Sequence, residues 1–69
     1  MKIKVNGKEK NIKLENKKAL LSSTLELLGY KPNTIVVEVN DLIINSTKWD
    51  KKIIKEGDIL EIVSIVGGG

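Results

Sequence analysis

A single stretch of this sequence has the periodicity of an amphipathic helix, and this limits the possible folds more than any other feature. The apolar stripe of that stretch consists of Leu21, Leu25 and Leu28, with Leu20 and Leu27 beside them. We expect the helix to begin near Lys17, with Asn16 as its N-cap. It is expected to end at Gly29, because glycine tolerates a left-handed cap and Pro32 shortly after cannot continue a helix. One helix covers one face of one sheet, so the other segments are expected to be strands whose second face stays uncovered.

The first fourteen residues alternate as two half-buried strands do. Ile3 and Val5 alternate with polar residues, and the Asn-Gly pair at 6–7 is the strongest short signal for a hairpin. In the return strand, Ile12 and Leu14 share one parity and are expected to face the core. Two antiparallel strands are therefore expected to open the fold.

Three further strands are expected at residues 34–39, 42–44 and 59–66. Glu38 and Glu61 mark the parity that meets water in the first and last of these strands. The side chains expected to face the core are Ile35, Val37, Val39, Leu60 and Ile62. Turns are expected at residues 40–41 and 56–58, where Asn, Asp and Gly gather.

The resulting order is strand, strand, helix, strand, short strand, strand, which predicts an α+β fold. A final strand beside the first, with one helix on one face of the sheet, is typical of the β-grasp arrangement, whereas a Greek-key barrel would not need the helix. We expect a mixed sheet of four or five strands. A chain of 69 residues buries only about 60% of its unfolded surface, so one domain is expected at residues 1–66, followed by a flexible glycine tail at 67–69.

The composition excludes much of enzyme chemistry. The chain has 12 basic residues, all of them lysine, 9 acidic residues and a net charge of +3, with no cysteine and no histidine. It therefore supplies no disulfide, thiolate nucleophile, imidazole base or zinc site. The lysines are interleaved with acids and the aromatic content is 3%, so we expect no nucleic-acid partner. No apolar run approaches the roughly 18 residues of a membrane span and no signal core is present, so we expect no membrane partner and a cytoplasmic location.

The sequence ends on Gly67-Gly68-Gly69, which places a carboxylate on three residues without side chains. Such a tail extends about 10 Å beyond the sheet and fits a channel too narrow for any side chain. A frayed terminus or an expression remnant has the same composition, so the tail alone leaves both interpretations open.

Three aliphatic side chains are expected on the uncovered face, close to the root of this tail. If the third and last strands pair, Val36, Val63 and Ile65 lie together there. Lys2 and Lys4 share the face with Glu61, and cross-strand charge pairing would explain them. A few exposed aliphatics are ordinary on any surface, but their place beside the tail favours a partner interface.

Two other residues invite a functional interpretation and have a simpler structural one. Trp49 is the single tryptophan, and we expect it to cover the edge of the core rather than anchor a ligand. Asp58 has the position of a lone catalytic acid, yet aspartate is typical of turns and no second titrating group accompanies it.

These segments together resemble the ThiS sulfur-carrier proteins of thiamine biosynthesis, which have the ubiquitin-like β-grasp fold, over essentially the whole chain. The similarity rests on the opening hairpin, the leucine helix with its glycine stop, residues 36–40, residues 46–49, Gly57-Asp58 and the ending at 60–69. Its most specific part is a Gly-Asp turn, one strand and a terminal Gly-Gly at fixed spacing. Asp41 stands where the family often has glycine, and Thr24 replaces a usual leucine; neither departure touches the tail.

The resemblance implies a protein co-substrate rather than an enzyme. A ThiF-type adenylyltransferase would adenylate the Gly69 carboxylate with Mg-ATP, and a cysteine desulfurase would supply the sulfur that makes it a thiocarboxylate. Gly68 and Gly69 would form the functional tail, with Gly67 as its root, and thiazole synthase would take the sulfur. The Mg-ATP would bind the partner, so this chain is expected to hold no cofactor and no metal.

Three alternatives share parts of this pattern. The small subunit of molybdopterin synthase has the same fold, tail and activation chemistry. A ubiquitin-like protein modifier would use the same carboxylate to form isopeptide bonds with lysines. An RNA-binding β-grasp module would rely on the lysine faces and would not need the tail.

Overall fold

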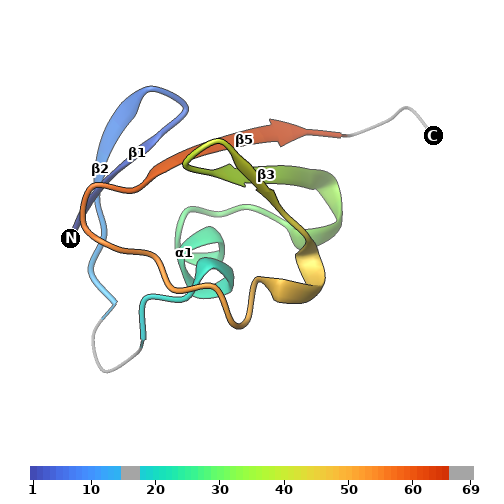
Figure 1. Ribbon diagram of the computed structural model, residues 1–69, viewed down its shortest axis with the longest axis horizontal. Helices are drawn as coiled ribbons and strands as arrows, with labels where there is room; N and C mark the ends of the chain where they lie inside the picture. Colours follow the sequence, from blue (N-terminus) through green and yellow to red (C-terminus); the bar gives the residue numbers. More distant parts are fainter. Residues whose placement is uncertain (15–17, 66–69) are drawn as a thin grey trace.

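The computed structural model describes residues 1–14 and 18–65, which form a five-stranded sheet with one α-helix against one of its faces (Figure 1). In chain order the elements are β1 (Lys2–Val5), β2 (Lys8–Asn11), α1 (Leu21–Leu27), the 3₁₀ turn η1 (Pro32–Thr34), β3 (Ile35–Val39), β4 (Leu42–Ile44), the 3₁₀ turn η2 (Ser46–Lys48) and β5 (Ile59–Ser64). The predictions for Asn16, Lys17, Val66 and the glycine tail at 67–69 lie outside the described residues.

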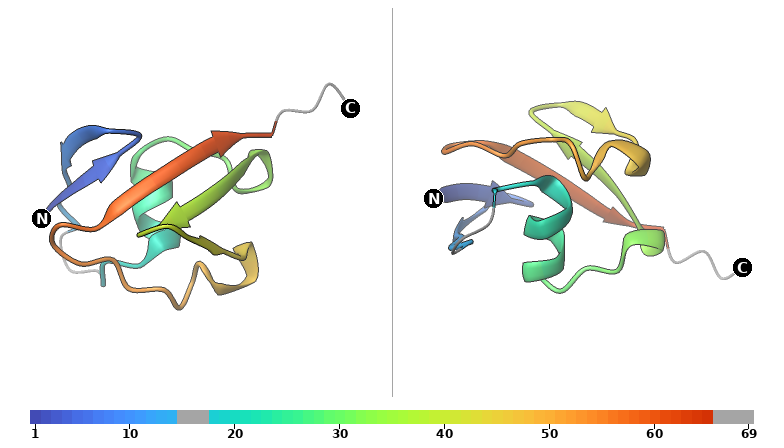
Figure 2. Two further views of the ribbon diagram at one scale, coloured as in Figure 1. Left: turned by 45° about the horizontal axis from the view of Figure 1, so that its top comes forward. Right: turned by 90° about the horizontal axis from the view of Figure 1, so that it is seen from below.

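The strand order in the sheet is β2-β1-β5-β3-β4. The last strand, β5, runs parallel to β1 and antiparallel to β3, and the other neighbours are antiparallel. Figure 2 (left) looks onto the sheet face opposite α1, with β5 between β1 and β3. The predicted mixed sheet, its single helix and the placement of the last strand beside the first are therefore confirmed, and the arrangement is a β-grasp fold.

Both predicted hairpin turns are present and have the backbone that tight hairpins require. Asn6 and Gly7 have φ values of 52° and 82°, and Asn40 and Asp41 have φ values of 51° and 71°. Positive φ at both central residues is the mark of type I′ turns, whose twist matches that of the flanking strands. Asparagine and aspartate tolerate this region better than most residues, which explains why Asp41 serves where glycine would be expected.

The return strand β2 is shorter than predicted and has no buried face. All four of its residues are exposed, and Ile12, which was expected to be its first inward residue, lies just beyond its end. Ile12 is buried at 4% exposure, and its backbone N–H donates to the Met1 carbonyl at 2.7 Å. The apolar parity in the sequence therefore continues past the strand, while the strand itself is a lysine-rich edge of the kind that discourages pairing with other chains.

The helix also differs from its prediction, at the start and on one side. It begins at Leu21, and its N-cap Leu20 is extended and makes no side-chain cap bond. Leu20 instead forms an isolated bridge with Ile53, so the chain enters the helix from a strand-like contact that local sequence does not encode. Leu27 is 53% exposed and does not widen the apolar stripe, whereas Thr24 is fully buried and donates its hydroxyl to the Leu20 carbonyl at 2.9 Å.

The end of the helix agrees with the prediction. Gly29 has a φ of +88°, its N–H donates to the Glu26 carbonyl, and the N–H of Tyr30 donates to the Leu25 carbonyl. This left-handed residue closes the helix in a glycine cap.

Replacement of Gly29 by alanine is expected to lower the free energy of unfolding by about 1 kcal/mol, because an L side chain is strained at this φ. No heavy atom lies within 4 Å of the position that the new Cβ would take, so the loss would come from the backbone alone. Urea denaturation measures the effect. Gly29→Asn is the matched control and should lose much less, and equal losses in the two variants would contradict this reading of the cap.

The core lies between the sheet and α1. Its buried apolar residues are Ile3, Val5, Ile12, Leu21, Leu25, Ile35, Val37, Val39, Trp49, Ile54, Leu60 and Ile62. All five side chains predicted to point inward from β3 and β5 are among them. Trp49 is 5% exposed and donates its indole N–H to the Ile44 carbonyl at 2.9 Å, so it closes the edge of the core, as the sequence predicts.

Candidate functional site

The uncovered face of the sheet brings the three predicted interface residues together. Val36 on β3 and Val63 on β5 are directly opposite each other in the antiparallel ladder. Val36, Val63 and Ile65 are 36%, 57% and 52% exposed, and none of them contributes to the core. We call these three residues the open-face patch.

The open-face patch lies where the described chain ends. Ile65 follows the last residue of β5, and its backbone N–H donates to the Thr34 carbonyl at 2.7 Å, which holds it against the start of β3. From Ile65 to Gly69 the chain has four peptide units, which reach at most about 14 Å. Residues 66–69 therefore continue the chain from a point that the Ile65–Thr34 bond holds beside the patch.

Two isoleucines that are not predicted from the sequence extend the apolar surface on this face. Ile43 on β4 is opposite Glu38 and is 70% exposed, and Ile59 shares the outward parity of Val63 along β5 and is 44% exposed. The run Leu42–Ile44 is apolar throughout, so the sequence does not show which of its side chains point to the open face. Only the pairing of β4 with β3 shows that Ile43 does.

The charges on the open face are arranged differently from the prediction. Glu61 does not lie opposite a lysine: its partner in the ladder is Glu38. Lys4 is opposite Glu9 on β2, and Lys2 is opposite Asn11. Cross-strand charge pairing therefore explains Lys4, as predicted, but not Lys2. Glu61 is the ladder partner of neither lysine, because β1 meets β5 in parallel only at its end, where Lys4 is opposite Ile59. Two like charges therefore face each other in the middle of the sheet.

Asp58 has a structural role, in agreement with the turn interpretation. Its carboxylate accepts hydrogen bonds from the Asn40 side chain at 3.0 Å and from the Lys55 backbone N–H at 2.8 Å. The Asn40 side chain in turn accepts from the Ile59 N–H at 3.0 Å. These bonds tie the turn before β5 to the β3–β4 turn, so both oxygens of Asp58 are used in holding the fold.

Asn6 holds the C-terminal half of β5 in place, a role that the hairpin signal did not reveal. Its side-chain oxygen accepts from the Ile62 N–H at 2.7 Å, and its side-chain nitrogen donates to the Ile62 carbonyl at 3.2 Å. The carboxamide thus replaces a backbone partner at the point where the β1–β2 hairpin turns away. This places a fixed point three residues before Ile65.

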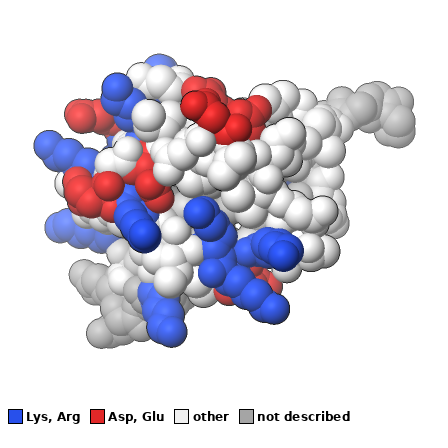
Figure 3. All heavy atoms as spheres, in the orientation of Figure 1, with Lys and Arg blue, Asp and Glu red and all other residues white. Residues whose placement is uncertain are grey.

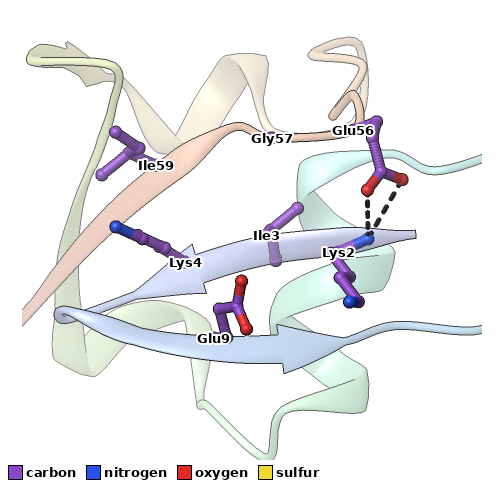
Figure 4. Close-up of a pocket in the computed structure, with 7 residues that line it drawn as sticks. All are labelled: Lys2, Ile3, Lys4, Glu9, Glu56, Gly57 and Ile59. Atoms are coloured by element: carbon purple, nitrogen blue, oxygen red, sulfur yellow. Dashed lines mark hydrogen bonds between the residues drawn. The ribbon is translucent and has the colours of Figure 1, made fainter.

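A shallow depression of about 320 Å³ lies beside β1, lined by Lys2, Ile3, Lys4, Glu9, Glu56, Gly57 and Ile59 (Figure 4). The carboxylate of Glu56 accepts the Lys2 backbone N–H with both oxygens, each at 3.1 Å. This bond satisfies a strand N–H and fastens the turn at Gly57 to the sheet. The depression is therefore accounted for by packing of the turn against β1.

Two kinds of site are absent from residues 1–14 and 18–65. These residues contain no group of three or more acidic side chains arranged to hold a metal ion. In the same part of the chain, no helix has both the length and the hydrophobicity that crossing a bilayer requires. The open face, with its exposed aliphatic residues and the Glu38–Glu61 pair, is the candidate functional surface of the described chain.

The fold and the open face define the class of protein. The chain is a small ubiquitin-like β-grasp protein whose uncovered sheet face includes the last described residues. Within that class, residues 3–69 match the ThiS family, so the chain belongs to the ThiS family. The match includes the three terminal glycines.

Solved structures agree with this assignment. The crystal structure of a thiamine biosynthesis protein (ThiS) from Geobacter metallireducens superposes with a TM-score of 0.80 at 25% identity, and each chain is covered completely. A solution structure of a thiamine biosynthesis protein from the same organism gives a TM-score of 0.78 at 26% identity and covers 100% of this chain and 88% of the other.

Sequence relatives fall into two groups. The uncharacterized protein ycf40 of Pyropia yezoensis is 31% identical over 67 residues, covering 97% of this chain and 90% of its own. The protein of the same name from Trieres chinensis is 39% identical over 49 residues, covering 71% of this chain and 67% of its own. A thiazole synthase of Paramagnetospirillum magneticum is 32% identical over 69 residues, which is 100% of this chain but only 20% of that protein.

Proposed function

We propose that this chain is a sulfur carrier of thiamine biosynthesis and that the Gly69 carboxylate carries the sulfur as a thiocarboxylate. The observation that carries the proposal is the match to the ThiS family over residues 3–69, which includes the glycine tail. Two similar solved structures named as thiamine biosynthesis proteins support it. The chain would then be a protein co-substrate, and its partners would do the catalysis.

The chemistry proposed for Gly69 has two stages. A carboxylate does not accept sulfur until one of its oxygens becomes a leaving group. A ThiF-type adenylyltransferase would let the carboxylate attack the α-phosphorus of Mg-ATP, forming an acyl-adenylate and releasing pyrophosphate. A persulfide charged by a cysteine desulfurase would then attack the acyl carbon and expel AMP, and a thiol would reduce the acyl disulfide to the thiocarboxylate. The carbon has to enter the active site of another protein, which suits residues without side chains.

Thiazole synthase is the acceptor that we propose. Thiazole synthases of Paramagnetospirillum magneticum and Magnetococcus marinus each contain a region, about a fifth of their length, that is similar to all of this chain. A carrier and its acceptor in one polypeptide would be held at high effective concentration, which supports a functional link between the two. The need for ATP and a desulfurase suits a cytoplasmic reaction.

The proposal is tested by incubating the 69-residue chain with Mg-ATP, a ThiF-type enzyme, cysteine, a cysteine desulfurase and a thiol, and recording its intact mass. We expect the increase that replacement of one oxygen by sulfur produces, and no increase when ATP is omitted. An unchanged mass with a partner that loads its own carrier would contradict the proposed function.

The open-face patch is proposed as the surface that meets the activating enzyme. Val63→Asp is expected to weaken binding to that enzyme at least about tenfold, because it places a carboxylate in the apolar contact opposite Val36. Calorimetric titration measures the affinity, and circular dichroism checks that the fold is unchanged.

Ile53→Asp is the matched control for this prediction. Ile53 is 52% exposed, close to the 57% of Val63, but it pairs with Leu20 at the start of the helix and not with β3. This variant should bind as the unmodified chain does. Equal affinity of the Val63→Asp variant and the unmodified chain would remove the patch from the interface.

A further inference from the structure

We propose that the Glu38–Glu61 pair selects a cationic partner for the open face: an Arg or Lys side chain of the activating enzyme binds between the two carboxylates while apolar side chains around them meet the patch. This inference rests on the proposed function, because the activating enzyme is the occupant that it assigns to the face.

The Glu38–Glu61 pair lies in the middle of the apolar part of the open face. Glu38 and Glu61 are directly opposite in the β3–β5 ladder, where Cβ atoms are about 5 Å apart. The next pair toward the tail on the same face is Val36 opposite Val63, and Ile43 lies opposite Glu38 on its other side. The two carboxylates therefore have apolar neighbours on β4 and toward the tail, where the apolar surface continues to Ile65, whereas β1 places Lys4 opposite Ile59, the preceding outward residue of β5.

Two carboxylates placed directly opposite each other have an electrostatic cost that a cation can relieve. Like charges directly opposite each other destabilise a sheet, and here neither ladder neighbour of Glu38 supplies a cation, since they are Glu61 and Ile43. An apolar partner that covered this face would also have to strip water from two carboxylates without replacing it, which is costly. A guanidinium or ammonium group lying between them removes both penalties, so the complementary partner is cationic at this point and apolar around it.

The charge of the whole molecule limits where a cationic partner can be attracted. The whole chain has a net charge of +3, so its overall charge opposes a cationic partner. Figure 3 shows carboxylates in several groups, one of them at the upper edge of the molecule beside a broad uncharged area, and most lysines on the left and lower sides. The nearest lysine in the ladder, Lys4, lies between Glu9 on β2 and Ile59 on β5 and is directly opposite neither Glu38 nor Glu61. The Glu38–Glu61 pair is therefore a local acidic site on a molecule of positive net charge, and its attraction for a cation acts at short range.

A second copy of this chain does not suit the face. A symmetric dimer that joined two patches would bring two Glu38–Glu61 pairs together, and four carboxylates would be covered by one interface. The pair therefore keeps the apolar patch from associating with itself and leaves it available for the enzyme.

The test compares charge-neutral variants at two salt concentrations. Glu38→Gln with Glu61→Gln is expected to lower the affinity for a ThiF-type enzyme about tenfold at low salt, and the difference should nearly vanish at about 0.5 M salt. The matched control is Glu26→Gln with Asp50→Asn, which removes two exposed charges beside α1, on the other side of the sheet, and should leave the affinity within about twofold.

Thermal unfolding separates this effect from damage to the fold. Relief of the like-charge pair should raise the melting temperature of the Glu38→Gln, Glu61→Gln variant while its affinity falls, which a merely structural role of the pair would not produce. Unchanged affinity at low salt, an equal loss in the control, or tighter binding would overturn the proposal. In sedimentation analysis we expect the unmodified chain to be a monomer. A dimer that dissociates when Glu38 and Glu61 are both replaced by lysine would overturn the proposal and identify a second copy of the chain as the occupant.

The affinities of the variants can be measured independently of the sulfur chemistry. If the unmodified chain binds the enzyme but gains no sulfur, the proposed function fails while the affinities of the variants still decide the role of the pair. If the chain is loaded and the variants bind normally, the proposed function stands and the charge proposal fails.

Discussion

Removal of Gly69 is expected to abolish sulfur loading and leave the fold unchanged. The deletion ends the chain one residue earlier and shortens its reach by about 3.5 Å, which is more than an in-line attack on phosphorus tolerates. Gly69→Ala keeps the length but adds a methyl group beside the reacting carbon, where we propose that the channel accepts no side chain, and it should lose loading as well. Intact mass after incubation with the activating enzyme measures the result.

The control for this experiment is Gly67→Ala. It adds the same methyl group to the tail and keeps the terminal Gly-Gly, so a partial loss of about severalfold in the loading rate is expected. All three variants should unfold at the same urea concentration as the unmodified chain, since the core residues end at Ile62. Normal loading after deletion of Gly69 would overturn the assignment of the tail.

Leu60→Ala is expected to have the largest effect on stability. Leu60 is fully buried in β5, the strand that joins the two halves of the sheet, and it pairs with Val5 on one side and Val39 on the other. Truncation of a buried leucine costs about 2–5 kcal/mol. A domain of this size has only about 5 kcal/mol in total, so a substantial fraction of the variant should be unfolded at room temperature.

Leu42→Ala is the matched control, with the same substitution at a position that is 67% exposed on the edge strand β4. It should change the free energy of unfolding by less than about 0.5 kcal/mol. Urea denaturation followed by tryptophan fluorescence suits both variants, because the single tryptophan, Trp49, is buried in the core. Equal destabilisation by the two variants would contradict the packing described for β5.

The alternating segments of the sequence could be interpreted because each contains a charged residue that labels one face. Glu38 assigns the parity of β3 and Glu61 that of β5, and the resulting inward side chains are all buried. From these parities and a pairing of the two strands, the open-face patch followed directly. The two hairpin turns were equally accessible, since Asn-Gly and Asn-Asp specify a local backbone conformation.

The features that escaped prediction depend on contacts between distant parts of the chain. The helix start is set by the bridge from Leu20 to Ile53, and β5 is held at Ile62 by the side chain of Asn6, 56 residues away. The meeting of Glu38 with Glu61 follows from the register of β3 and β5, which parity alone does not give. Tertiary pairing decides each of these, and a single sequence contains no local signal for it.

The central claim, that sulfur is carried on the Gly69 carboxylate, is tested most directly by locating the sulfur after loading. Lys55 is the last lysine of the chain, so cleavage after lysine releases residues 56–69 as one peptide that holds the whole tail. We predict that the mass increase for one oxygen replaced by sulfur appears in that peptide alone, and that fragmentation places it on Gly69. Sulfur in any other peptide, or residues 56–69 joined to a lysine of another protein, would contradict the account; the second result would identify a protein modifier instead.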